Sequence, residues 1–239
     1  MSKQIAMSKQ CSNRLQKDVI DIIKNPLTEH GIYYVHDEDN MLQGYAIIFG
    51  PSNSIYRYGA YCFKFSFPTT YPFSPPTVTY LTNDGNTRFH PNLYRNGKVC
   101  ISILNTWKGE QWTSCQNIKS ILLMLVTLFH NKPLLNEPGI KETHKSFIPY
   151  NKIITYKNIE IAILRTLKLT NIQESCLSFI PIYKKYIINN KKQILKYVKY
   201  LKNVNSNEQT ISISIYNMKT CIDYATLYKN LKEKLKELN

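Results

Sequence analysis

A cysteine, an asparagine and a histidine lie close together in the segment Phe89–Thr113. Cys100 follows His90-Pro91-Asn92 and comes soon after Asn96-Gly97, a pair that favours a tight turn. Because a short exposed stretch is expected after such a turn, Cys100 is a candidate nucleophile whose thiolate can take an acyl group as a thioester. The alternative is a small packing residue, which is the role we expect for Cys62, Cys115 and Cys176.

The side chains beside this cysteine suggest two further roles. An amide N–H stabilises the charge that builds on a carbonyl oxygen during acyl transfer, so Asn92 is a candidate donor to that oxygen. The alternative for Asn92 is turn formation through its side chain, and both roles can hold together. His90 could serve as the base of a Cys–His protease, but such a dyad needs a base that a third group orients across the site. We therefore favour a structural role for His90.

Several short motifs occur in order along the chain: Gly50-Pro51, Tyr58-Gly59, the Pro-rich loop Tyr71–Pro76, His90-Pro91-Asn92, and Cys100 eight residues after Asn92. From about residue 12 to 168 the chain closely resembles the ubiquitin-conjugating enzyme family. The resemblance implies that Cys100 takes ubiquitin or a similar modifier from an activating enzyme, then passes it to a lysine or to a ubiquitin ligase. It also implies that Asn92 stabilises the oxyanion or stiffens the loop, while His90 and Pro91 hold the loop.

The resemblance implies other site residues as well. A lysine amine has a pKa of about 10.4, so something must favour its neutral form. Family members place an acidic residue in the loop after the long helix, and Glu137 takes that place here, with an ordinary exposed glutamate as the alternative. The family's partner surface comprises the first helix, the Pro-rich loop and the Trp loop. It makes Arg14, Lys17, Phe73 and Trp112 candidates for partner binding, with core packing as the alternative for the two aromatic residues.

The chain departs from the family in the loop after the cysteine. Ser102 stands where members often have Asp, Trp112-Thr113-Ser114 replaces the usual Trp-Ser-Pro, and residues 107–110 look like an insertion. The longer loop and a C-terminal extension resemble an atypical branch of larger conjugating enzymes. The resemblance implies no metal and no organic cofactor, because ATP is used upstream by the activating enzyme. A non-catalytic scaffold with the same fold is the main rival, but such variants usually lack the cysteine.

Hydrophobic periodicity predicts the elements that must position these residues. We expect a helix at about Ser12–Asn25, strands at Gly31–Val35, Leu42–Phe49, Tyr61–Phe67 and Thr77–Leu81, and a helix at about Tyr150–Leu169. Between the last strand and the helix at Tyr150–Leu169 we expect a further, apolar helix, and Thr113 and Gln116 predict the capping box at its start. This order is an α+β layout. With the resemblance, it implies the ubiquitin-conjugating fold: an N-terminal helix, a four-stranded antiparallel meander, C-terminal helices and a helical C-terminal extension.

The predicted organisation is an N-terminal tail (1–11), a catalytic domain (12–169) and a basic, mainly helical extension (170–239). An apolar stripe from Ile180 to Leu201 predicts a helix, Asn203–Asn207 a break, Ile211–Ile215 a short strand, and the last residues a final helix. Such a stripe is costly to leave in water, so it should pack on the core or on a partner. We expect the extension to be dispensable for the chemistry.

Charge and composition limit the remaining function classes. The formal net charge is +15, and most of the excess lies in residues 151–239. An acidic partner could explain it, but no nucleic-acid-binding module is recognisable, and a solvated helix face is the simpler explanation. No apolar run suits a membrane span, and the first residues do not form a signal peptide. No Cys-x-x-Cys pair supports a zinc site. We expect a protein of the cytoplasm, the nucleus or both.

Overall fold

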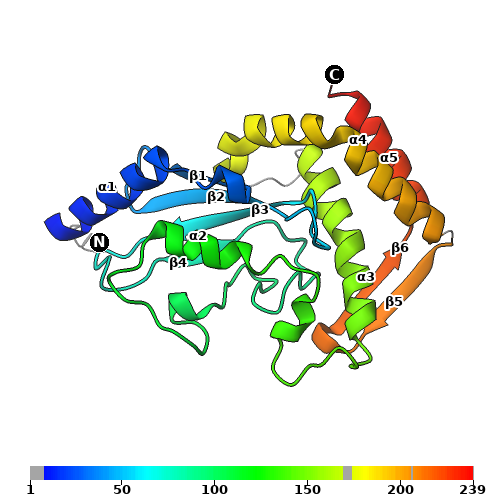
Figure 1. The fold of residues 1–239 in the computed structure, drawn as a ribbon, viewed down its shortest axis with the longest axis horizontal. Helices are drawn as coiled ribbons and strands as arrows, with labels where there is room; N and C mark the ends of the chain where they lie inside the picture. Colours follow the sequence, from blue (N-terminus) through cyan, green and yellow to red (C-terminus); the bar gives the residue numbers. More distant parts are fainter. Residues whose placement is uncertain (1–7, 169–173, 206, 239) are drawn as a thin grey trace, which may run out of the picture.

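A four-stranded antiparallel sheet lies at the centre of the protein in the computed structural model, which describes residues 8–168, 174–205 and 207–238 (Figure 1). The strands are β1 (Ile32–His36), β2 (Gln43–Phe49), β3 (Ala60–Ser66) and β4 (Thr77–Tyr80), and they lie side by side in chain order. Each strand pairs with the next, and Phe63 on β3 lies opposite both Ala46 and Tyr80. The predicted meander is therefore confirmed.

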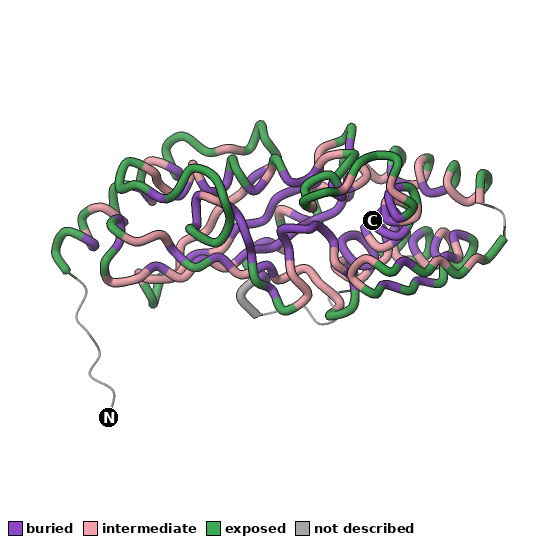
Figure 2. The backbone as a smooth tube through the Cα atoms, turned by 90° about the horizontal axis from the view of Figure 1, so that it is seen from below, coloured by how far each residue is buried: buried purple, intermediate pink, exposed green. Residues whose placement is uncertain are grey.

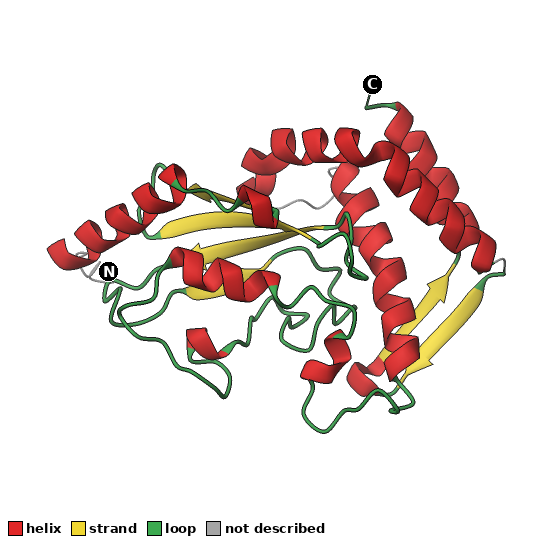
Figure 3. Ribbon diagram, in the orientation of Figure 1, coloured by secondary structure: helices red, strands yellow, loops and turns green. Residues whose placement is uncertain are grey.

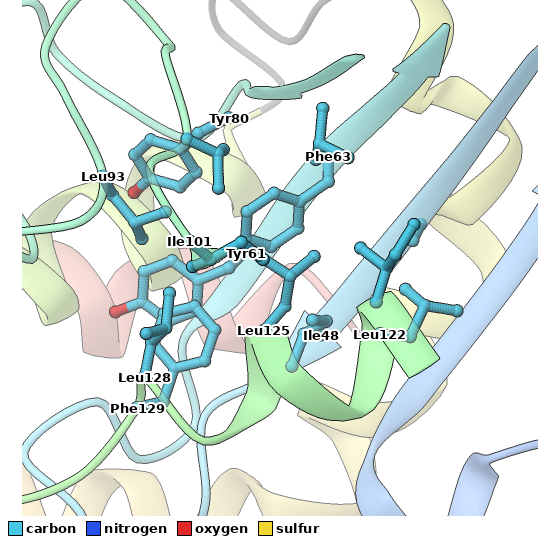
Figure 4. Close-up of a cluster of buried hydrophobic side chains, with 14 of the residues drawn as sticks. Ile48, Tyr61, Phe63, Tyr80, Leu93, Ile101, Leu122, Leu125, Leu128 and Phe129 are labelled. Carbon is cyan, nitrogen blue, oxygen red and sulfur yellow. The ribbon is translucent and has the colours of Figure 1, made fainter. Parts of the chain in front are cut away.

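The two faces of the sheet pack against different parts of the chain, because successive side chains of a strand point to opposite sides. On β3, Tyr61 and Phe63 enter one hydrophobic cluster, whereas Cys62 enters a second. In the first cluster, Phe63 lies near Leu125 from the helix that covers this face (Figure 4). Alternate side chains of this strand therefore enter two separate cores.

Helix α1 (Lys9–Lys24) begins three residues before the predicted start and packs on the first cluster through Leu15 and Ile22. Its first turn is capped by Ser8, whose hydroxyl oxygen accepts a hydrogen bond from the amide of Cys11 at 3.1 Å. Such a cap satisfies a backbone donor that has no partner inside the helix. The predicted N-terminal helix is confirmed.

Helix α2 (Ile118–Val126) covers the first face of the sheet, but its predicted capping box is wrong. Thr113 and Gln116 instead close a turn, in which the Gln116 side chain accepts from the Thr113 amide at 3.1 Å. Asn117 and Ser120 form the box: Asn117 Oδ1 accepts from the Ser120 amide at 3.0 Å, and Ser120 Oγ accepts from the Asn117 amide at 3.3 Å. The asparagine prevails because it directly precedes the first buried apolar residue of the helix.

The helix after the candidate site is split into two parts. Helix α3 (Phe147–Lys157) continues into the π-helical segment η4 (Asn158–Arg165), where a single helix to Leu169 was predicted. Asn158 is fully buried at the junction and accepts a hydrogen bond from the Tyr61 hydroxyl at 2.6 Å. This bond ties the change of helix type to the central strand. Leu169 itself lies outside the described residues.

The second face of the sheet is covered by the C-terminal extension. Helix α4 (Ile180–Val204) lies along this face, opposite α2, and the ring of its Tyr186 stacks on Phe49 at 3.8 Å (Figure 1). The hydroxyl of Tyr183 donates to the carbonyl oxygen of Ile163 in η4 at 2.7 Å. The apolar stripe therefore packs on the core, one of the two predicted outcomes. Among the described residues, no helix combines the length and apolarity that a membrane crossing needs.

A hairpin of β5 (Gln209–Ile213) and β6 (Met218–Ile222) follows α4, lies beside α3, and leads into helix α5 (Tyr224–Lys236) (Figure 3). Strand β5 confirms the predicted short strand, whereas β6 was not predicted. Ile213 and Met218 join the first cluster, and α5 joins the second. Buried segments accordingly continue from the sheet into the extension (Figure 2).

A chain ended at residue 169 would expose apolar side chains of both clusters, so the extension completes the hydrophobic core, and its dispensability for the chemistry stays a prediction. The predicted domain boundary falls on residues outside the described ranges. Short helical turns complete the fold, at η1 (Thr28–His30), η2 (Ser102–Leu104), η3 (Pro133–Asn136), η5 (Glu174–Phe179) and η6 (Ile215–Asn217).

Candidate active site

A tight hairpin carries Asn92 on one arm and Cys100 on the other. Its turn is Tyr94–Gly97, closed by a hydrogen bond from the Gly97 amide to the Tyr94 carbonyl oxygen at 3.0 Å. Gly97 has φ +87°, a conformation that favours glycine, as the predicted Asn96-Gly97 turn requires. The amide of Cys100 then donates to the carbonyl oxygen of Asn92 at 2.9 Å. The two candidate residues are therefore joined across the hairpin.

Two apolar side chains fix this hairpin to the core. Leu93 follows Asn92, Ile101 follows Cys100, and both are buried in the first cluster with Leu125 of α2 (Figure 4). Because each anchor is the chain neighbour of a candidate residue, packing of the core sets where Asn92 and Cys100 lie.

The side chain of Asn92 is buried and bound to the cysteine. Its Nδ2 donates to the carbonyl oxygen of Cys100, while its Oδ1 is buried with no hydrogen-bond partner among the described residues. This geometry corresponds to loop stiffening, one of the two predicted roles. Nδ2 carries two hydrogens, so one remains for a second acceptor such as a thioester oxygen.

His90 is fully buried and accepts a hydrogen bond at Nδ1 from the Asn92 amide at 3.0 Å. Burial, together with the nearby His130 and Arg88, holds the pKa of His90 well below its ordinary range, because the charged imidazolium is poorly solvated there. The ring is therefore neutral at neutral pH, with its proton on Nε2. Pro91 also contributes to this loop, since its carbonyl oxygen accepts from Arg88 Nη2. These contacts fit the predicted structural roles of both residues.

Cys100 is covered, with only 2% of its surface exposed. The expectation of an exposed stretch after the turn is wrong at Cys100, and the loop that follows is bonded to the backbone on both sides of it. Thr106 Oγ1 accepts from the Ile101 amide at 3.0 Å and donates to the Val99 carbonyl oxygen at 3.1 Å, which are the residues on either side of Cys100. An acyl donor can reach the sulfur only after this loop or the side chain moves.

This covering predicts the order in which cysteines react with an alkylating reagent. Cys115 is exposed, so the packing role expected for it is wrong, and we expect iodoacetamide to modify it at least about tenfold faster than Cys100 in the folded protein. Peptide mass spectrometry over a time course would measure both rates, and the same pair in denaturant provides the control, where the difference should vanish. Equal rates in the folded protein would show that burial does not protect Cys100.

Glu137 lies directly after η3, beside the long loop that follows the cysteine. Its neighbour Pro138 lines a cavity of about 540 Å³ together with that loop's Asn105, Thr106, Trp107, Lys108 and Gln111. Glu137 is half-buried, and its carboxylate accepts a hydrogen bond from the hydroxyl of Tyr216 in the extension. It is therefore not an ordinary exposed loop glutamate. Tyr216 was not singled out from the sequence, where nothing distinguishes it from the other tyrosines.

The four candidates for partner binding divide into two groups. Lys17 is exposed on α1, and Phe73 is 65% exposed on the Pro-rich loop, so both are accessible and their role stays a prediction. Trp112 is buried, and its Nε1 donates to the carbonyl oxygen of Pro72 at 2.7 Å. For Trp112 the structure favours core packing, the alternative that the sequence left open.

Arg14 is occupied by contacts within the chain. Its Nε donates to the Asp18 carboxylate at 2.9 Å, and its two terminal nitrogens donate to the carbonyl oxygens of Ser114 and Gln116. Asp18 is only 7% exposed and also accepts from the Tyr71 hydroxyl. The guanidinium therefore links α1 to the turn before α2, and its role in partner binding stays a prediction.

Replacing Arg14 with alanine is expected to lower the free energy of unfolding by about 2 kcal/mol, because it leaves the buried Asp18 carboxylate without its cation. Chemical denaturation followed by circular dichroism would measure the loss. Lys17→Ala on the same helix is the matched control and should change stability by no more than about 0.5 kcal/mol. Equal stabilities of the two variants would contradict this account of Arg14.

The chain is similar in sequence to proteins of one known family. Residues 14–157 match the family model described as ubiquitin-conjugating enzyme. The chain is 38% identical over 164 residues to ubiquitin-conjugating enzyme E2 Z of Xenopus tropicalis, covering 67% of this chain and 52% of that protein. It is 40% identical over 157 residues to the Homo sapiens protein of the same name, covering 64% and 44%.

Because the matched segment makes up more than half of the residues, the chain belongs to the ubiquitin-conjugating enzyme family. It spans about half the length of these curated relatives. The solved structure of human ubiquitin-conjugating enzyme E2 G1 aligns with a TM-score of 0.45 at 26% identity, over 52% of this chain and 98% of that chain. The long loop after Cys100 and the extension are compatible with the predicted atypical branch.

Proposed function

We propose that this protein accepts ubiquitin or a ubiquitin-like modifier from an activating enzyme as a thioester on Cys100. It then transfers the modifier to a substrate lysine, directly or with a ubiquitin ligase. The observation that carries the proposal is the hairpin that joins Asn92 to Cys100 in a chain of this family. The proposed setting is the cytoplasm, the nucleus or both, and ATP is consumed only by the activating enzyme.

In the charging step, the Cys100 thiolate attacks the carbonyl carbon of the modifier's thioester with the activating enzyme. A new carbon–sulfur bond forms at Cys100, and the activating enzyme's sulfur leaves as a thiolate. Because Cys100 is almost fully buried, its side chain or a neighbouring segment must move first.

In the transfer step, a neutral lysine amine attacks the thioester carbonyl, and negative charge builds on its oxygen. The second Nδ2 hydrogen of Asn92 is the proposed donor to that oxygen, because the first is held by the Cys100 carbonyl. The carboxylate of Glu137 is the proposed group that orients the amine and favours its loss of a proton. Cys100 leaves as a thiolate, so the enzyme returns to its starting state.

The test is a charging assay with purified activating enzymes, ATP and a panel of ubiquitin and ubiquitin-like modifiers. At least one modifier should give an adduct that survives a non-reducing gel and disappears when thiol reductant is added. Binding of a modifier without any such adduct would favour the rival reading, a non-catalytic scaffold, and would overturn the proposal.

A further inference from the structure

The tip of the C-terminal hairpin lies against the candidate active site. The turn η6 (Ile215–Asn217) connects β5 to β6, and Ile213 and Met218 on either side anchor it in the first hydrophobic cluster. Tyr216 and Asn217 have φ +59° and +47°, a left-handed conformation that non-glycine residues seldom adopt. Such a conformation persists where surrounding contacts fix it, and it often marks a functional position.

Tyr216 contacts two separate segments of the site. Its hydroxyl donates to the carboxylate of Glu137, and its carbonyl oxygen accepts from Arg95 Nη2, in the turn between Asn92 and Cys100. The guanidinium of Arg88 lies over the Tyr216 ring at 5.0 Å. Arg88 in turn donates from Nε to the carbonyl oxygen of His90 at 3.2 Å. One residue of the extension therefore joins the Glu137 loop to the hairpin that carries the cysteine.

The hydroxyl of Tyr216 is a dependable donor. Burial, reinforced by the hydrogen bond to Glu137, raises the pKa of Tyr216 well above its ordinary value, so the phenol keeps its proton at neutral pH. A carboxylate accepts hydrogen bonds but cannot donate them when ionised, so Tyr216 and Glu137 are chemically matched. The ring is also held edge-on by Tyr150, with centroids 6.1 Å apart. The direction of the hydroxyl is thus set by packing of the ring.

We propose that Tyr216 is a positioning residue, which holds the carboxylate of Glu137, the group proposed above to receive an incoming lysine amine. This inference rests on the proposed function. The hydrogen bond is separable from the fastening of the extension, since Arg88 and Arg95 contact the ring and the backbone of Tyr216, whereas Glu137 contacts only the hydroxyl among the interactions described. Removing the hydroxyl therefore releases the carboxylate and leaves the fastening in place.

Tyr216→Phe tests this separation by single-turnover discharge of the charged protein. We expect normal charging and about tenfold slower discharge to free lysine, the usual size for losing one hydrogen bond to a charged group. Discharge to hydroxylamine should be unchanged, because its amine is already neutral at neutral pH and needs no carboxylate. Glu137→Gln should show the same pattern, and adding Tyr216→Phe to it should cause no further loss, as for two residues that act as a unit.

Tyr200→Phe, at an exposed tyrosine of α4, is the matched control and should discharge like the wild type. Wild-type discharge to lysine by Tyr216→Phe would overturn the inference, and so would faster discharge, which would show that the hydroxyl restrains the carboxylate. Equal slowing with lysine and hydroxylamine would also overturn it, because the hairpin itself would have shifted. Absence of charging in the wild type would instead overturn the proposed function, and the inference with it.

Discussion

Cys100→Ala is expected to abolish formation of the modifier adduct, because alanine has no atom that can attack the thioester carried by the activating enzyme. Cys100→Ser should form at most an oxyester, which resists thiol reductant, because an oxygen ester is not cleaved by thiol exchange. Non-reducing and reducing gels of parallel charging reactions would separate the three outcomes.

The exposed Cys115 provides the matched control for these variants. Cys115→Ser should charge like the wild type, and its adduct should remain sensitive to reductant. Circular dichroism should show that both Cys100 variants are folded, since alanine and serine are each no larger than the cysteine that they replace. Full charging of Cys100→Ala would show that another residue carries the modifier.

Asn92→Ala is expected to slow discharge of the thioester to free lysine by about 10²–10³-fold, the loss typical for one donor to an oxyanion. Charging should suffer much less, because the Cys100 amide still bonds the backbone of Asn92 across the hairpin. Single-turnover rates of the two steps, measured separately, would show the difference.

Asn86→Ala is the control here, since Asn86 is an exposed asparagine in a different loop. It should leave both rates unchanged. Equal loss of charging and discharge in Asn92→Ala would mean that its bond to the Cys100 carbonyl oxygen matters chiefly for the shape of the hairpin, and that the amide does not act on the oxyanion.

Local patterns in the sequence were enough for the sheet and for the hairpin turn. Hydrophobic periodicity predicted the strand at Tyr61–Phe67, where Tyr61 and Cys62 lie on opposite faces, and Gly97 supplied the left-handed residue that the turn needed. The burial of Cys100 could not be predicted from local sequence patterns. The loop that follows is bonded through Thr106 to the backbone on both sides of the cysteine, and a hydroxyl in a loop has many possible partners.

The contribution of the extension to the site was beyond prediction for a related reason. The apolar stripe of α4 indicated that a buried face existed, but not that its Tyr186 would meet Phe49 on the sheet. Tyr216 and Glu137 are separated by 79 residues, and no periodicity relates positions so far apart. The same limit applies to Arg14. The sequence placed it on the polar face of a helix, but it could not predict the distant carbonyl oxygens to which its guanidinium donates.

Locating the modifier on the charged wild-type protein tests the proposed function most directly. The charged protein would be digested under acidic, non-reducing conditions and its modified peptide identified by mass spectrometry. We expect the C-terminal remnant of the modifier on the peptide that contains Cys100, and its loss after treatment with reductant. A remnant on the more exposed Cys115 would contradict the account. So would a remnant that is found only on a lysine, remains after reductant, and occurs without any remnant on Cys100.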